Sequence, residues 1–184
     1  MFDFEIENEL RPNLSPGEKL LWTGKPKQGL MLRSSDAFLI PFSLLWGGFA
    51  VFWESSVVAS GGPIFFMLWG IPFVLMGIYI TVGRFFVDAY KRSKTIYGLT
   101  PDRVLIKSGI FSRDVKSINI KTLSDITINQ KSDNSGTITL GATDSRYASM
   151  QGMNWPGVTQ TPMLELGDDV LNVYNKIIEL QRQK

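Results

Sequence analysis

The side chains that carry most enzyme chemistry are missing from this chain, which contains neither histidine nor cysteine. Disulfides, thiolate nucleophiles, the usual zinc sites and the commonest general base are therefore excluded. A catalytic site would have to use carboxylates, lysine, serine or tyrosine, with Ser124 and Asp125 as one conceivable pair. Because no constellation of these residue types is visible, we expect a protein that is not an enzyme and that holds no metal ion or cofactor.

The chemistry that the sequence does offer is the binding of anionic groups by lysine and arginine. Cationic side chains next to a membrane each gain about 1 kcal/mol from anionic lipid headgroups. The candidate contacts to lipid or to the membrane surface are Arg84, Lys91, Arg92, Lys94, Lys107, Arg113 and Lys116. From residue 95 to the C-terminus, however, ten lysines and arginines are balanced by nine acidic residues. Without a basic excess, binding of nucleic acid is not indicated.

Apolar side chains in two loops are candidates for contact with a protein partner. Ile110 and Phe111 lie at a turn between two expected strands, and Trp155 lies in the polar, irregular stretch 143–161. Such residues either pin a loop onto a core or dock a partner. The sequence leaves both interpretations open.

Two uncharged apolar runs, Ala37 to Trp53 and Gly61 to Gly83, decide where these residues are placed. As a helix the second run would extend about 34 Å, enough to cross a hydrocarbon core of about 30 Å. The first run reaches about 25 Å and gains length if it includes residues up to Val58. We therefore predict a transmembrane helical hairpin over residues 37–83, with spans of about 37–58 and 61–83.

The distribution of charge sets the direction of this hairpin. Lysines and arginines flank the two runs on their outer sides, whereas the expected turn, Glu54 to Gly62, carries none. The positive-inside rule then places both termini in the cytoplasm. Because no Asp, Glu, Lys, Arg or His falls inside the two apolar runs, a carrier or channel is disfavoured.

The residues before the hairpin form a leader of uncertain role. Phe2 to Leu10 alternates apolar and acidic residues, as a half-buried strand or an amphipathic arm would. Glu18 to Pro26 predicts a short strand that ends in a turn. Whether this leader packs on the C-terminal part of the chain stays open at the level of sequence.

After residue 94 the pattern changes to short β-branched segments separated by turns, which is typical of an antiparallel sheet. The last segment precedes Gly167-Asp168-Asp169, which should cap a C-terminal helix with acids at its positive end. That helix should bury one apolar face formed by Val170, Leu171, Tyr174, Ile177 and Ile178. The predicted strands are Thr95–Leu99, Arg103–Lys107, Val115–Ile120, Ile126–Gln130, Thr137–Leu140 and Met163–Leu166.

Several of these segments carry a family resemblance. Tyr97-Gly98-Leu99-Thr100, the strand from Arg103 to Gly109, Val115 to Ile118, Ile126 to Ile128 and Gly136 to Ile138 resemble the bacterial pleckstrin-homology-like (PH-like) domain of membrane-anchored proteins. The leader from Pro16 to Pro26 and the two spans resemble that family too. The resemblance implies an α+β PH-like fold, a partly open antiparallel barrel capped by a C-terminal helix. Eukaryotic relatives by fold often bind phosphoinositides, but Asp114 interrupts the basic cluster of this chain.

These observations predict four parts: a cytoplasmic leader (1–36), the transmembrane hairpin (37–83), a juxtamembrane helix extension (84–94) and a cytoplasmic PH-like domain (95–184). We expect a non-catalytic, multi-pass protein of the bacterial inner membrane that presents this domain for binding another protein or for self-assembly. The alternative is a sensor of anionic membrane lipid. No nucleic acid and no small-molecule substrate is expected as a partner.

Overall fold

The computed structural model describes residues 4–33, 35–109, 113–142 and 161–183. The chain forms two compact units. The hairpin unit is one continuous stretch, Leu30–Asp88, whereas the sheet unit combines Met1–Gly29 with Ala89–Lys184. The leader therefore belongs to the same unit as the C-terminal half of the chain, although the whole hairpin separates them in sequence.

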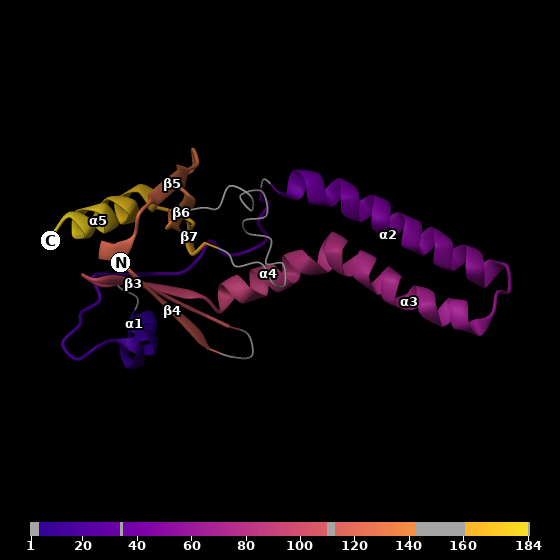
Figure 1. The fold of residues 1–184 in the computed structure, drawn as a ribbon, viewed down its shortest axis with the longest axis horizontal. Helices are drawn as coiled ribbons and strands as arrows, with labels where there is room; N and C mark the ends of the chain where they lie inside the picture. The colour runs from indigo at the N-terminus through magenta and orange to yellow at the C-terminus, as the bar shows by residue number, and fades with distance from the viewer. Residues whose placement is uncertain (1–3, 34, 110–112, 143–160, 184) are drawn as a thin grey trace. The chain divides into compact units, whose positions relative to one another are not determined.

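The hairpin unit contains two apolar helices, α2 (Asp36–Ala59) and α3 (Ile64–Ile78), shown in Figure 1. A π-helical turn, η2 (Tyr79–Gly83), continues α3 into α4 (Arg84–Ser93), whose last five residues belong to the sheet unit. Both α2 and the continuous helical segment from Ile64 to Ser93 are long and apolar enough to cross a membrane. The two helices pack closely at Gly77, where an added Cβ would lie 2.9 Å from the Cα of Gly47.

Helix α2 is longer at its far end than the apolar run suggests. It continues through Glu54 to Ala59, so the connection to α3 is limited to residues 60–63. The expectation of a turn starting at Glu54 is therefore wrong, whereas the extension of the first apolar run to Val58 matches the extent of α2. The helix that could cross a membrane contains a carboxyl group, and the expectation of spans free of ionisable groups fails at this position.

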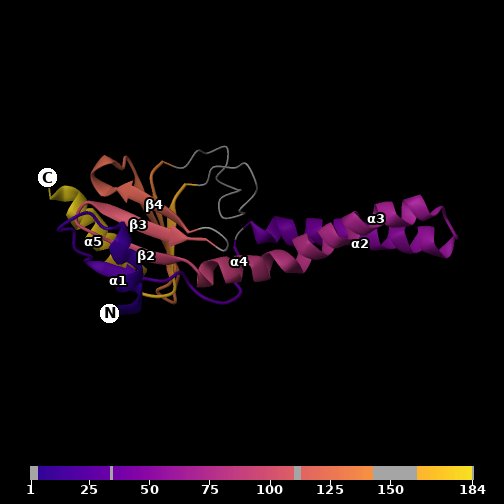
Figure 2. The same cartoon turned by 90° about the horizontal axis from the view of Figure 1, so that it is seen from below.

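The first sheet of the other unit has the order β1 (Trp22–Gly24), β2 (Ile96–Leu99), β3 (Arg103–Ser108), β4 (Asp114–Asn119), and every pair is antiparallel. Strands β2, β3 and β4 lie side by side in Figure 2. The leader strand pairs with β2, with Trp22 opposite Leu99 and Gly24 opposite Tyr97. The hairpin unit is thus inserted between two neighbouring strands of this sheet.

The second sheet has the order β5 (Ile126–Gln130), β6 (Gly136–Leu140), β7 (Met163–Leu166), also antiparallel, and follows β4 through the 3₁₀ turn η3 (Ile120–Thr122). The leader connects the two sheets, because Pro26 forms an isolated bridge with Leu166 and the Lys27 N–H donates to the Glu165 carbonyl at 2.9 Å. Among the described residues no strand pair joins β4 to β5. The predicted strands are confirmed to within a residue or two, and the two sheets do not form a closed barrel.

The main core lies between the sheets and the C-terminal helix α5 (Val170–Arg182). Val170, Val173 and Ile177 of α5 are almost fully buried there, together with Ile138 and Leu164 of the second sheet. Apolar residues three and seven positions after Val170 form this face, so Leu171, predicted to be buried, is 46% exposed.

The start of α5 also differs from the expectation. Asp169 does precede the helix, but with φ 52° its side chain makes no capping hydrogen bond to the backbone. The carboxylate instead accepts a hydrogen bond from the Asn172 side chain at 2.9 Å. Asp169 is therefore at the predicted N-cap position, but the predicted capping hydrogen bond is absent.

The leader covers the outer face of the first sheet. Its first segment is the helix α1 (Phe4–Leu10), followed by the 3₁₀ turn η1 (Arg11–Asn13), so the strand interpretation of this segment is wrong. Ile6 and Leu10 form a second apolar cluster with Ile96. At Gly98 of β2 an added Cβ would lie 2.8 Å from the Leu10 side chain, so a larger residue there would require the leader side chains to shift. The leader is an integral part of the sheet unit.

Candidate functional site

Strand register brings four strand ends together at one end of the first sheet. Gly24 at the end of β1 is opposite Tyr97, Ile96 at the start of β2 is opposite Lys107, and Ser108 is opposite Asp114 at the start of β4. Both chain connections to the hairpin unit leave from this end, after β1 and before β2. We call it the junction end. Four of the seven candidate cations, Lys94, Lys107, Arg113 and Lys116, fall in or beside these strand ends, and the other three are in helix α4.

Two of these cations are bound within the protein. Lys107 is only 7% exposed, and its ammonium donates to the Glu9 carbonyl of α1 at 2.7 Å. Arg92 is 5% exposed and donates from Nη2 to the carbonyl of Gly29 at 2.5 Å. Both side chains hold the leader against the rest of the sheet unit through backbone oxygens, and the Lys107 ammonium also lies 3.5 Å from a carboxylate oxygen of Glu9.

Arg84 is also paired, within the hairpin unit. Its Nη1 lies 2.6 Å from a carboxylate oxygen of the buried Asp36, and its Nε donates to the Ile80 carbonyl at 2.8 Å. A second ion pair joins Arg33 and Asp88 at 3.1 Å. Asp36 at the start of α2 therefore compensates much of the positive charge of Arg84 in α4.

The other four candidate cations are Lys91, Lys94, Arg113 and Lys116. Lys94, Arg113 and Lys116 are exposed, whereas Lys91 is half-buried. The Lys94 ammonium lies 5.9 Å from the centre of the Tyr90 ring. The structure therefore keeps three of the seven proposed lipid contacts on the surface of the junction end. Ile110, Phe111 and Trp155 lie outside the described residues and stay predictions.

Sequence reasoning missed the group that fixes the leader, which centres on Arg103. In β3, Arg103, Leu105 and Lys107 alternate with core residues and so point to the face that the leader covers. The Arg103 guanidinium donates to both carboxylate oxygens of Glu18, at 2.9 and 2.6 Å, and to the Asn13 carbonyl at 3.2 Å. Hydrogen bonds from Arg103 lower the pKa of Glu18 to about 2, and Glu18 in turn raises the pKa of Arg103. The only available signal was a glutamate in the leader and an arginine starting a strand.

A second contact holds the end of the leader. The Lys27 ammonium lies 3.0 Å from an Asp133 carboxylate oxygen and 3.2 Å from the Ser135 hydroxyl oxygen. Hydrogen bonds from Ser135, and then from Lys27, lower the pKa of Asp133 below its usual range. Asp133 therefore links the β5–β6 turn to the end of the leader.

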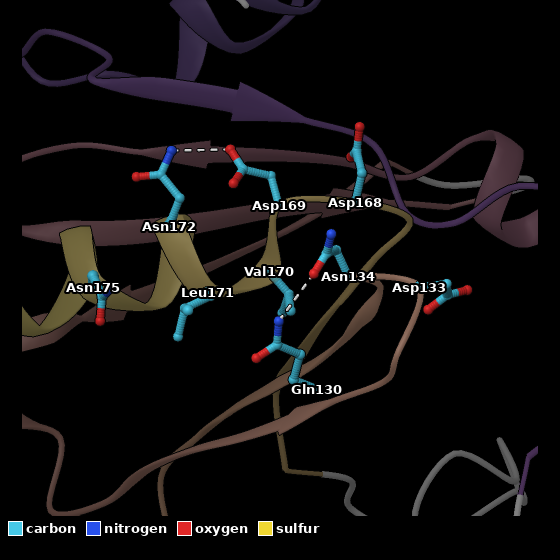
Figure 3. Close-up of a pocket in the computed structure, with 9 residues that line it drawn as sticks. All are labelled: Gln130, Asp133, Asn134, Asp168, Asp169, Val170, Leu171, Asn172 and Asn175. Atoms are coloured by element: carbon cyan, nitrogen blue, oxygen red, sulfur yellow. Dashed lines mark hydrogen bonds between the residues drawn. The ribbon is translucent and has the colours of Figure 1, made fainter.

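A pocket of about 510 Å³ lies between this turn and the start of α5, and its lining side chains are drawn in Figure 3. Two hydrogen bonds lie within it, from Gln130 to Asn134 at 3.3 Å and from Asn172 to Asp169 at 2.9 Å. Its side chains are amides, carboxylates and two aliphatic groups, a chemistry suited to a polar ligand without negative charge. The lining residues are Gln130, Asp133, Asn134, Asp168, Asp169, Val170, Leu171, Asn172 and Asn175.

The pair considered for catalysis is not organised as a site. Ser124 and Asp125 are exposed in the link between η3 and β5, outside the pocket. Among the described residues no hydrogen bond joins their side chains, so the serine is not activated by its neighbour.

A further surface is the open edge of strand β4. It is the last strand of its sheet, and its outer side has no strand partner among the described residues. Asp114, Lys116, Ser117 and Asn119 are exposed along it. An unpaired strand edge presents a row of backbone donors and acceptors that an extended peptide can complete.

Two antiparallel sheets and a C-terminal helix define the fold of the sheet unit. A family model for the bacterial PH domain matches residues 39–167. Because this match covers more than half of the chain, the protein belongs to the bacterial PH domain family, and the resemblance noted from the motifs is confirmed. No curated protein and no solved structure matches the chain. PH domains are generally non-catalytic binding modules, and no catalytic family is indicated.

Proposed function

We propose that this is a non-catalytic protein of the bacterial cytoplasmic membrane whose hairpin unit spans the bilayer and whose sheet unit binds another protein in the cytoplasm. The flanking lysines and arginines favour cytoplasmic termini. The fold adds an independent argument. Because the leader and the C-terminal half form one unit, the chain must enter and leave the hairpin on the same side of a membrane.

The observation that carries the binding function is the open edge of β4. Strand addition to such an edge gains affinity from main-chain hydrogen bonds and specificity from alternate side chains. Self-assembly through this edge is less favourable than binding of a different protein. Antiparallel pairing of two copies centred on Lys116 would set two lysines opposite each other, and centring on Ser117 would set Lys116 opposite Ile118. We therefore propose an extended segment of a second protein as the occupant.

Photo-crosslinking in intact cells tests this proposal. A photoreactive amino acid at position 116 should trap one partner, whereas the same residue at position 179, exposed on α5, should not. A synthetic peptide of the trapped segment should then slow amide hydrogen exchange in β4 more than in β2, whose amides are already paired on both sides. Equal trapping from both positions, or a trapped segment that leaves β4 exchange unchanged, would contradict strand addition.

A second candidate function is contact with anionic lipid, favoured by the three exposed cations of the junction end. Full-length protein is placed in vesicles of neutral or partly anionic lipid, and the acylation rates of Lys94 and Lys116 are compared with that of Lys131 in the β5–β6 turn. Lipid contact predicts that anionic vesicles slow acylation of the first two lysines only, and that high salt restores it. Unchanged rates would remove this candidate, because Arg84, Arg92 and Lys107 are already bound within the protein and leave few other cations to contact lipid.

A further inference from the structure

The backbone groups on the open edge of β4 belong to alternate residues. In an antiparallel pair, opposite residues alternate between pairs that exchange hydrogen bonds and pairs that do not. The Ile120 N–H donates to the Asp102 carbonyl at 2.9 Å, and the ladder between β3 and β4 continues in the same register. Residues an even number of positions before Ile120 therefore bond to β3, whereas the N–H and C=O groups of Val115 and Ser117 point to the open edge.

The side chains of β4 that face the core differ sharply in character. Ile118 and Lys116 lie opposite Val104 and Ile106, two core residues of β3. Ile118 packs against the main core but is only partly buried. Lys116, on the same side of the sheet, is exposed and has no hydrogen bond or ion pair among the described residues. The core side of the open edge therefore offers one incompletely covered apolar group and one unpaired cation.

An added strand must match both groups. Antiparallel addition is favoured, since it is slightly more stable per residue than parallel addition. The positions opposite Ile118 and Lys116 are then pairs without hydrogen bonds, in which facing side chains are closest. An apolar residue opposite Ile118 would extend the main core, against which Ile126 and Ile128 of the edge strand β5 are also only partly buried. A carboxylate opposite Lys116 would attract its ammonium, whereas a cation there would be repelled.

We propose that the segment bound by β4 carries an apolar residue followed two positions later by aspartate or glutamate, an inference that rests on the strand addition proposed above. The order follows from the antiparallel direction, because the partner strand meets Ile118 before Lys116. A lysine that faces inward on an edge strand also hinders unwanted pairing with other chains. In β4 the same charge acts as a filter, because it disfavours basic segments and favours acidic ones.

The test supplies the strand as an extension of the full-length chain. The end of α5 lies beside the turn that follows β4, because the Gln181 side-chain amide donates to the carbonyls of Ile120 and Leu123 at 3.3 and 3.0 Å. The C-terminus is extended by about twelve glycine and serine residues, which span about 19 Å on average, and then by the segment Thr-Val-Thr-Glu-Thr. In the antiparallel direction, valine can lie opposite Ile118 and glutamate opposite Lys116.

Amide hydrogen exchange of the protein in detergent, resolved to single residues, is the measurement. Without the extension, Val115 and Ser117 should exchange faster than Lys116 and Ile118, because only the latter two amides are bonded to β3. The extension should slow exchange at Val115 and Ser117. Replacing its glutamate with lysine should reduce this protection by about 10-fold, because an attractive cross-strand pair becomes a repulsive one.

Two charge variants of the protein sharpen the test. Lys116→Glu should reverse the preference, so that the extension with lysine protects Val115 and Ser117 more strongly than the extension with glutamate. Lys131→Glu makes the same change of charge at an exposed position of the β5–β6 turn and should leave the preference as it is in the wild type.

The outcomes separate this inference from the proposed function. Equal protection by the two extensions, or an unchanged preference in K116E, overturns the proposed motif and leaves strand addition standing. Lack of protection by either extension overturns strand addition to β4, and the motif with it.

Discussion

Replacing Glu18 with glutamine tests whether the leader is held by charge. The Glu18 side chain is 10% exposed. Its carboxylate accepts two hydrogen bonds from Arg103 and one from the Ser15 N–H at 2.8 Å. Folding lowers its pKa from 4.5 to about 2. At about 1.4 kcal/mol per pKa unit, ionisation of Glu18 stabilises the fold by about 3 kcal/mol at pH 7.

The pH dependence has a defined sign. A carboxyl whose pKa is lower in the folded protein contributes its stability above the unfolded pKa and loses it as the pH falls toward the folded value. The wild type should therefore lose this contribution between about pH 4.5 and pH 2. E18Q should be less stable by about 3 kcal/mol at pH 7, and the difference should shrink as the pH falls through that interval.

Urea titration of the full-length protein in detergent, read out by pulse proteolysis of the leader, measures both effects. Glu7→Gln is the matched control, because it removes an exposed ion pair with Arg11 at 3.5 Å and should change the unfolding free energy by less than about 0.5 kcal/mol. A loss in E18Q below about 1 kcal/mol, or a loss that does not change with pH, would refute the assignment of the leader's attachment to this ion pair.

Three further predictions follow from the fold. Deleting residues 30–88 and joining the two remaining segments by a short flexible linker should give a protein with cooperative thermal unfolding by circular dichroism, whereas residues 89–184 alone should lack it because β1 and α1 are missing. Arg84→Asp should lower the temperature of aggregation in detergent, since a lost partner of a buried ion pair costs about 3 to 5 kcal/mol, and adding Asp36→Arg should recover part of the loss. Gly136→Ala should destabilise the sheet unit to urea by about 1 to 3 kcal/mol, because the new methyl group would overlap a backbone carbonyl oxygen of β5.

Local sequence patterns predicted where the strands lie but not which strands pair with each other. Short segments rich in apolar or β-branched residues and separated by turn residues located β2 to β7. The pairing of Trp22 with Leu99 leaves no comparable mark, since 76 positions separate the two residues and each also fits other neighbours. The leader was therefore predicted as a separate part, whereas in the structure it supplies one strand and one helix to the sheet unit.

The same limit explains why the contacts of individual side chains in the candidate site were not predicted. Lys107 was predicted to face a membrane because a lysine near a strand end is ordinarily exposed, and its bond to the Glu9 carbonyl depends on where α1 docks. Glu54 was assigned to a turn because a charge usually ends an apolar run. Its place beside Gly70 became visible only once α2 and α3 were packed against each other.

The insertion of the hairpin between β1 and β2 also fixes an order of events during synthesis. At about 5 to 20 residues per second, the ribosome needs several seconds to make the chain between these strands. During that interval the leader has emerged but its neighbour in the sheet does not exist. The first sheet can therefore be completed only after both apolar helices have been synthesised.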